Sequence, residues 1–93
     1  MTTPEQPTYN GHANRSTWLV GLCIDNDELH YHAKIAKLLA HETTVTAAQA
    51  ERIAEELGGR GMIAKEGGDW HEIYWPDIAE CWQSEKEEYI AYS

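Results

Sequence analysis

The chain has 93 residues, 42% of them hydrophobic and 25% charged, which is enough for one hydrophobic core and no second one. Sixteen acids against seven bases give a net charge of −9, a strongly acidic balance for this length. Nucleic acids and anionic membranes are polyanions that bind basic surfaces, so direct binding to either is not expected. No apolar run reaches the roughly 20 residues of a membrane span and nothing resembles a signal peptide, so we expect a cytoplasmic protein.

The N-terminal part of the chain predicts an arm followed by a buried helix. Residues 1–13 hold two of the three prolines and an Asn-Gly turn pair, which predicts an extended arm. Residues 14–93 are expected to form a single globular domain. At its start, residues 15–25 are apolar around nearly the whole circumference of a helix, which predicts a buried helix capped by Asn14 or Ser16. A buried strand is the competing interpretation of this segment.

Two further helices are predicted from helical periodicity. In residues 27–41, the apolar residues that share one side are Leu29, Ala33, Ile35, Ala36, Leu39 and Ala40, with Tyr31 and Leu38 at the margin. The polar residues of the opposite, solvent-facing side are His30, Lys34, Lys37 and His41. Thr46 and Gln49 have the spacing of a capping box, so the next helix is expected to begin there and to end at Gly58-Gly59.

The last third of the chain predicts a loop and a final helix. Glycine-rich residues 58–74 are typical of a loop, and a short β-hairpin over 62–74, turned at Gly67-Gly68, is a second interpretation. Pro76 suits the first position of a helix, because its missing amide has no partner to lose there. The apolar side of this helix is formed by Trp75, Ile78, Trp82 and Tyr89. The expected fold is mainly α, a compact single-domain bundle of about four helices.

Catalytic and metal chemistry have weak support in the sequence. Cys23 and Cys81 are far apart and lack CxxC spacing, so two reduced thiols packed as small hydrophobes are expected. His30 and His32 lie two positions apart and point to opposite sides of a helix, so they cannot share one ion. No serine or cysteine has a recognisable histidine and acid partner. We therefore expect neither an enzyme nor a bound cofactor or metal.

The acids are distributed unevenly, which indicates a surface for a basic partner. Residues 50–93 carry eleven acids and four bases, against five and three in residues 1–49. Four tryptophans, five tyrosines and no phenylalanine add side chains suited to half-buried interfaces. The predicted partner-binding residues are Trp70, Tyr74 and Trp75 beside the glycine-rich loop and Asp77, Glu80, Glu87 and Glu88 on the last helix. Solubility alone is the simpler explanation of the acidity.

Three other hypotheses stay open at this point. Arg15, Lys34 and Lys37, with nearby histidines, could form a basic surface of a nucleic-acid-associated module. The histidines could instead serve a metal-dependent enzyme. A small chain this rich in tyrosine and tryptophan is also compatible with a symmetric homodimer.

Residues 9–32 contain a Tyr-Asn-Gly turn followed by a spaced pattern made of Asn14, Thr17, Trp18, Val20, Leu22, Asn26, Asp27 and Tyr31. This pattern resembles the opening of a family of small proteins found in bacteriophages, prophages and archaeal mobile elements. Asp77-Ile78-Ala79-Glu80 loosely matches a later element, whereas Cys23 and the glycine-rich 58–68 segment depart from the family pattern. The resemblance implies a small helical accessory protein and brings no known activity. By analogy, it implies a non-enzymatic anti-defence inhibitor, of the anti-CRISPR or anti-restriction type, that presents a nucleic-acid-mimicking acidic surface to a host protein.

Overall fold

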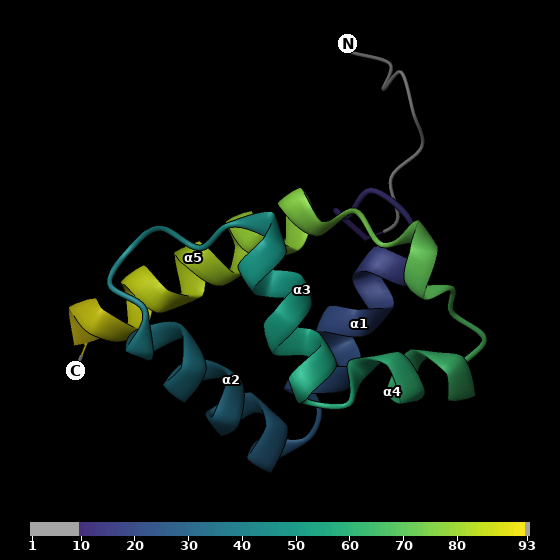
Figure 1. Ribbon diagram of the computed structural model, residues 1–93, viewed down its shortest axis with the longest axis horizontal. Coiled ribbons are helices and arrows are strands. Elements are labelled where there is room, and N and C mark those ends of the chain that lie inside the picture. The colour runs from purple at the N-terminus through teal and green to yellow at the C-terminus, as the bar shows by residue number, and fades with distance from the viewer. Residues whose placement is uncertain (1–9, 93) are drawn as a thin grey trace, which may run out of the picture.

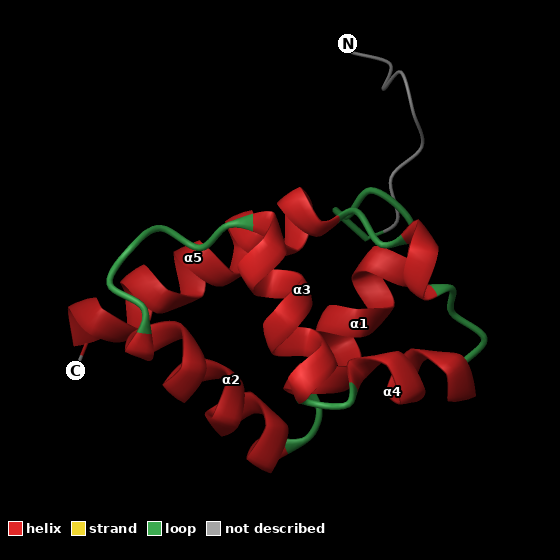
Figure 2. Cartoon of the chain, viewed as in Figure 1, coloured by secondary structure: helices red, strands yellow, loops and turns green. Residues whose placement is uncertain are grey.

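The computed structural model describes residues 10–92, and their fold is mainly helical (Figure 1). The elements in chain order are α1 (Arg15–Asp25), α2 (Glu28–Ala40), α3 (Ala47–Glu56), α4 (Gly59–Lys65), the short 3-10 helix η1 (Trp70–Glu72) and α5 (Trp75–Tyr92). Figure 2 shows only helices and connecting loops over these residues. The mainly α class is therefore confirmed, with α4 as an additional helix beyond the four expected.

Side chains cap the starts of three helices, and two of these caps, Asn14 and Thr46, were predicted from the sequence. Asn14 accepts a hydrogen bond from the amide three residues further on, at 2.9 Å, and begins α1. Asp27 accepts from the His30 amide and begins α2, and this hydrogen bond is the main cause of the lowered pKa of Asp27. Thr46 and Gln49 form the expected capping box of α3. Each cap satisfies amides that lack a partner within the helix.

The bounds of α2 agree with the prediction, but its buried face does not. Lys34, Ile35 and Leu38 are buried, whereas Leu29 is 81% exposed. The segment is therefore a helix, as predicted, but the side of the helix that faces the core is not the predicted one. The physical reason is that two carboxylates outside α2 hold the Lys34 ammonium inside the molecule, so the lysine stem takes the inward position.

The hairpin interpretation of 62–74 is wrong, because α4 and η1 occupy this segment. Two glycines of the glycine-rich residues 58–74 lie at close contacts between elements. A Cβ on Gly59 would lie 2.9 Å from the carbonyl oxygen of Ala54, and a Cβ on Gly68 would lie 2.8 Å from Cδ2 of Leu19. The missing side chains of these glycines thus let the segment approach α1 and the end of α3. Contacts of this kind join separate elements, so they could not be predicted from the neighbouring sequence.

Alanine substitutions in α4 should separate this packing role from helix propensity. Gly61 has open space around it, so Gly61→Ala should stabilise the fold by about 0.5–1 kcal/mol through the lower backbone entropy of the unfolded chain. Gly59→Ala should destabilise it by about 1–2 kcal/mol, because the new methyl group meets backbone. Urea denaturation of both variants measures the difference. If the two substitutions change the free energy of unfolding equally and in the same direction, the close contact between Gly59 and Ala54 is contradicted.

The core lies where α5 packs against α1, α2 and α3 (Figure 1). Its largest fully buried apolar side chains are Val20, Ile24, Leu38, Ile63, Ile78 and Trp82. Cys23 and Cys81 are free, half-buried thiols that pack against this core, as expected. Of the predicted arm, residues 1–9 lie outside the described part of the chain, and residues 10–13 include direct contacts to α5.

Candidate functional site

The outward side of α5 carries exposed carboxylates without a matching cation. Glu80, Glu87 and Glu88 are exposed, and none of them forms an ion pair within residues 10–92. Lys86 is the sole lysine or arginine of α5 and is buried. Its ammonium donates to the carbonyl oxygens at the end of α2, those of His41 and Thr43. The inward turn of this lysine leaves the exposed side of α5 acidic.

Most other cations of the described chain are also held by internal partners. Lys34 is 0% exposed and lies 2.6 Å from Asp25 and 2.5 Å from Glu85. The remaining contacts are Lys37 with Glu56, Arg60 with Glu55, and Arg15 with the carbonyl oxygens of Glu66 and Gly67. These bonds leave few mobile positive charges to screen the acidic side of α5.

The proposed basic surface of Arg15, Lys34 and Lys37 is therefore wrong. Lys34 is inaccessible, and the other two side chains are committed to the contacts above. His30 and His32 lie beside different acids, Asp27 and Glu28, as their helical spacing predicts. Among residues 10–92, Lys34 therefore cannot contribute to a phosphate-binding face of the predicted kind.

The predicted aromatic part of the site divides between core and surface. Trp70 is only 7% exposed, and its ring lies 5.0 Å from that of Trp75 and 4.8 Å from the Arg60 guanidinium. It is therefore a packing residue, which corrects its assignment to the partner surface. Trp75 is half-buried, and Tyr74 is 56% exposed just before α5. Of the three aromatics, Tyr74 has the accessible ring.

An acidic and aromatic groove at the C-terminal end of α5 was missed by the sequence reasoning. It is lined by Tyr31, Glu85, Glu88, Tyr89 and Tyr92. The four α5 residues have the spacing i, i+3, i+4 and i+7, which places them on one face of the helix. That spacing was the available signal, but Tyr89 was placed on the apolar side of the helix with Trp82, and it is 46% exposed. Carboxylates beside aromatic rings can bind an arginine or lysine through ion pairs and cation–π contacts.

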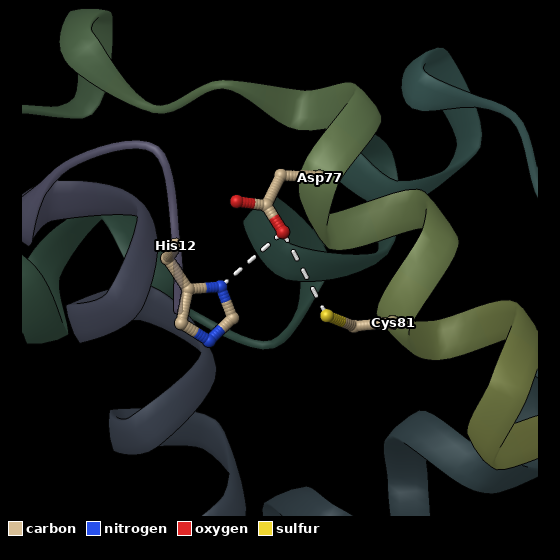
Figure 3. Close-up of side chains that lie close together, drawn as sticks. All are labelled: His12, Asp77 and Cys81. Atoms are coloured by element: carbon tan, nitrogen blue, oxygen red, sulfur yellow. Dashed lines mark hydrogen bonds and ion pairs between the residues drawn. The ribbon is translucent and has the colours of Figure 1, made fainter. Parts of the chain in front are cut away.

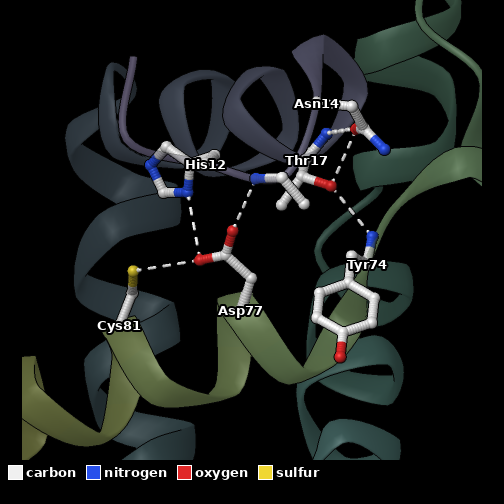
Figure 4. A network of polar contacts seen from close by, with 7 residues as sticks. His12, Asn14, Thr17, Tyr74, Asp77 and Cys81 are labelled. Carbon is white, nitrogen blue, oxygen red and sulfur yellow. Dashed lines mark hydrogen bonds and ion pairs between the residues drawn. The ribbon is translucent and has the colours of Figure 1, made fainter. Parts of the chain in front are cut away.

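Asp77, the first acid of α5, faces inward rather than toward a partner. Its Oδ1 lies 3.3 Å from Nδ1 of His12 and 3.7 Å from Sγ of Cys81 (Figure 3). Its Oδ2 accepts the Ala13 amide at 2.9 Å. Figure 4 shows this cluster beside the Asn14 and Thr17 cap, so the turn before α1 is tied to the start of α5 by side chains of both segments.

The Asp77 cluster lacks the arrangement of a cysteine nucleophile. Such a nucleophile needs a histidine next to the thiol to accept its proton, whereas here the carboxylate lies between the two groups. Burial, followed by the charge of Asp77, raises the pKa of Cys81. Burial also raises the pKa of Cys23. Neither thiol is activated by its protein surroundings.

Residues 10–92 thus form an all-helical fold whose last helix carries exposed carboxylates that make no ion pair within these residues. The chain belongs to a family of unknown function, DUF7249, whose model matches residues 5–89. No curated protein and no solved structure matches the chain. Across residues 10–92, every helix is too short or too polar to traverse a lipid bilayer.

Proposed function

We propose that this protein acts without catalysis, by docking the acidic side of α5 onto a basic surface of a partner protein. The observation that carries the proposal is the exposure of Glu80, Glu87 and Glu88, which form no ion pair with any residue of 10–92, while Lys86 is turned inward. A partner that supplies arginines and lysines would neutralise these carboxylates and gain a fast, electrostatically steered association.

The groove at the C-terminal end of α5 supports the same kind of partner. Glu88 and the exposed rings of Tyr89 and Tyr92 offer both parts of an arginine or lysine site. Tyr74, exposed before α5, lies at the opposite end of the same helix. The proposed surface therefore combines the exposed carboxylates of α5 with the aromatic groove at its C-terminal end and with Tyr74 before its first turn.

The partner class that fits best is a protein whose basic groove normally binds nucleic acid. A helix with uncompensated carboxylates along one side presents to such a groove the charge that phosphates would present. For a chain with the opening pattern described above, we extend the proposal to an accessory protein of mobile-element origin that inhibits a host defence enzyme. This role predicts competition with DNA or RNA for the same site on the partner.

Charge reversal on α5 should weaken binding to a basic ligand. With an arginine-rich peptide as the probe, Glu80→Lys combined with Glu87→Lys should raise the Kd about tenfold, because two attractions become repulsions. The matched control is Glu28→Lys with Glu66→Lys, which changes the net charge equally at exposed positions outside α5. Fluorescence titration of the tryptophans measures both. If both double variants weaken peptide binding equally, the effect comes from the net charge of the protein alone. That result would contradict the proposed surface.

The homodimer hypothesis, which the sequence left open, stays untested. Light scattering on the free protein and on its mixture with the peptide gives the mass of each species. If the protein is a dimer, the α5 variants also show whether this helix forms the dimer interface, since charge reversal would then change the mass as well as the affinity.

A further inference from the structure

Three donor atoms of different chemical type meet between the turn before α1 and the start of α5 (Figure 3). They belong to His12, Asp77 and Cys81, and all lie within 4.8 Å of one another. Asp77 and Cys81 are four positions apart on α5, which places them on one face of the helix. We propose that these three side chains bind a zinc ion, and none of the three belongs to the docking surface proposed above.

The spacing of the donors fits a tetrahedral ion. Zinc lies about 2.0–2.2 Å from nitrogen and oxygen ligands and about 2.3 Å from sulfur, so tetrahedral edges are roughly 3.4 Å between N and O and roughly 3.6 Å between O and S. The distances here are 3.3 Å from His12 Nδ1 to Asp77 Oδ1 and 3.7 Å from Asp77 Oδ1 to Cys81 Sγ. Two edges of the coordination polyhedron are thus already in place.

Charge and outer contacts also favour a dication. A carboxylate, a thiolate and a neutral imidazole together carry two negative charges, which zinc neutralises. Glu85 lines the same cavity as His12 and Cys81, so a further carboxylate lies beside the site. The second oxygen of Asp77 is held by the Ala13 amide, an outer hydrogen bond of the kind that orients metal-ligating carboxylates.

The fourth position of the ion would open into a cavity. His12 and Cys81 line a cavity of about 220 Å³ whose wall also includes Asp25 and Glu85. Because a water molecule takes up about 30 Å³, this space admits one or more waters as the remaining ligand. Three protein ligands and one open position distinguish this site from a closed four-ligand structural zinc site.

Cobalt substitution tests the site in the full-length protein, purified without a histidine tag. One equivalent of Co²⁺ should give a thiolate-to-cobalt charge-transfer absorption, which Zn²⁺ removes by displacement. Cys81→Ser should abolish this absorption, and His12→Gln should weaken Zn²⁺ binding by about tenfold or more. Cys23→Ser and His71→Gln are the matched controls, and both should bind as the unchanged protein does.

Thiol labelling gives a second measurement that needs no variant to fold. Iodoacetamide modification followed by peptide mapping should show that Zn²⁺ protects Cys81 and leaves the rate at Cys23 unchanged, whereas Mg²⁺ protects neither. The proposal is overturned if cobalt gives no charge-transfer absorption, if the absorption depends on Cys23, or if zinc protects both thiols equally.

Discussion

Replacing Lys34 with methionine should destabilise the fold by about 3 kcal/mol, because it removes the cation from a buried charge cluster. The Lys34 ammonium is 0% exposed and binds the carboxylates of Asp25 and Glu85. It also lies 4.8 Å from the ring centre of Tyr31 and 5.4 Å from that of Trp82. Methionine keeps much of the apolar stem but leaves two neighbouring carboxylates to repel each other. Urea denaturation measures the change in the free energy of unfolding.

The control for this variant is Lys37→Met on the same helix. Lys37 pairs with Glu56 at 2.9 Å, but both side chains are exposed, so the loss should stay below about 1 kcal/mol. Helix propensity and net charge change alike in the two variants, and only the burial of the lysine differs. A Lys34→Met variant as stable as Lys37→Met would show that the buried cluster does not hold α2 to α1 and α5.

Thr17→Val should cost about 2 kcal/mol, because one buried hydroxyl links three segments. The Thr17 hydroxyl donates to Oδ1 of Asn14 and accepts the Tyr74 amide at 2.8 Å (Figure 4). Asn14 in turn donates to the carbonyl oxygen of Glu72 at 2.7 Å. Valine preserves the shape of the side chain and leaves the Tyr74 amide without its acceptor.

Two measurements identify the cause of this loss. The free energy of unfolding should fall, and hydrogen exchange at the Tyr74 amide should become faster than in the unchanged protein. Thr44→Val, at an exposed loop position, should change stability by less than about 0.5 kcal/mol. If Thr17→Val destabilises the protein without faster exchange at Tyr74, the hydroxyl does not act through this bond.

The helix starts were predictable because a cap and its helix are adjacent in sequence. Asn14 and Thr46 each bond to an amide three residues away, so these two caps can be assigned without the tertiary structure, whereas Asp27 was not predicted as the cap of α2. The buried face of α2 was not predictable in this way. It depends on Lys34 meeting Asp25 and Glu85, and the second of these lies 51 positions further along the chain.

The candidate surface was predictable to the extent that it follows helical spacing. Glu80, Glu87 and Glu88 are exposed on α5 as expected. Trp70 was misassigned because its burial comes from Arg60 and Trp75, which approach it only in the folded chain. The cluster of His12 with Asp77 joins positions 65 apart, and no local pattern connects them.

The salt dependence of binding tests the central claim most directly. If the uncompensated carboxylates of α5 bind a basic surface, the Kd of the unchanged protein for the arginine-rich peptide should rise steeply with salt concentration. The Glu80→Lys, Glu87→Lys variant should show a much shallower rise, and the Glu28→Lys, Glu66→Lys control should keep most of the slope. A Kd that does not change with salt, or equal slopes for all three proteins, would contradict the account.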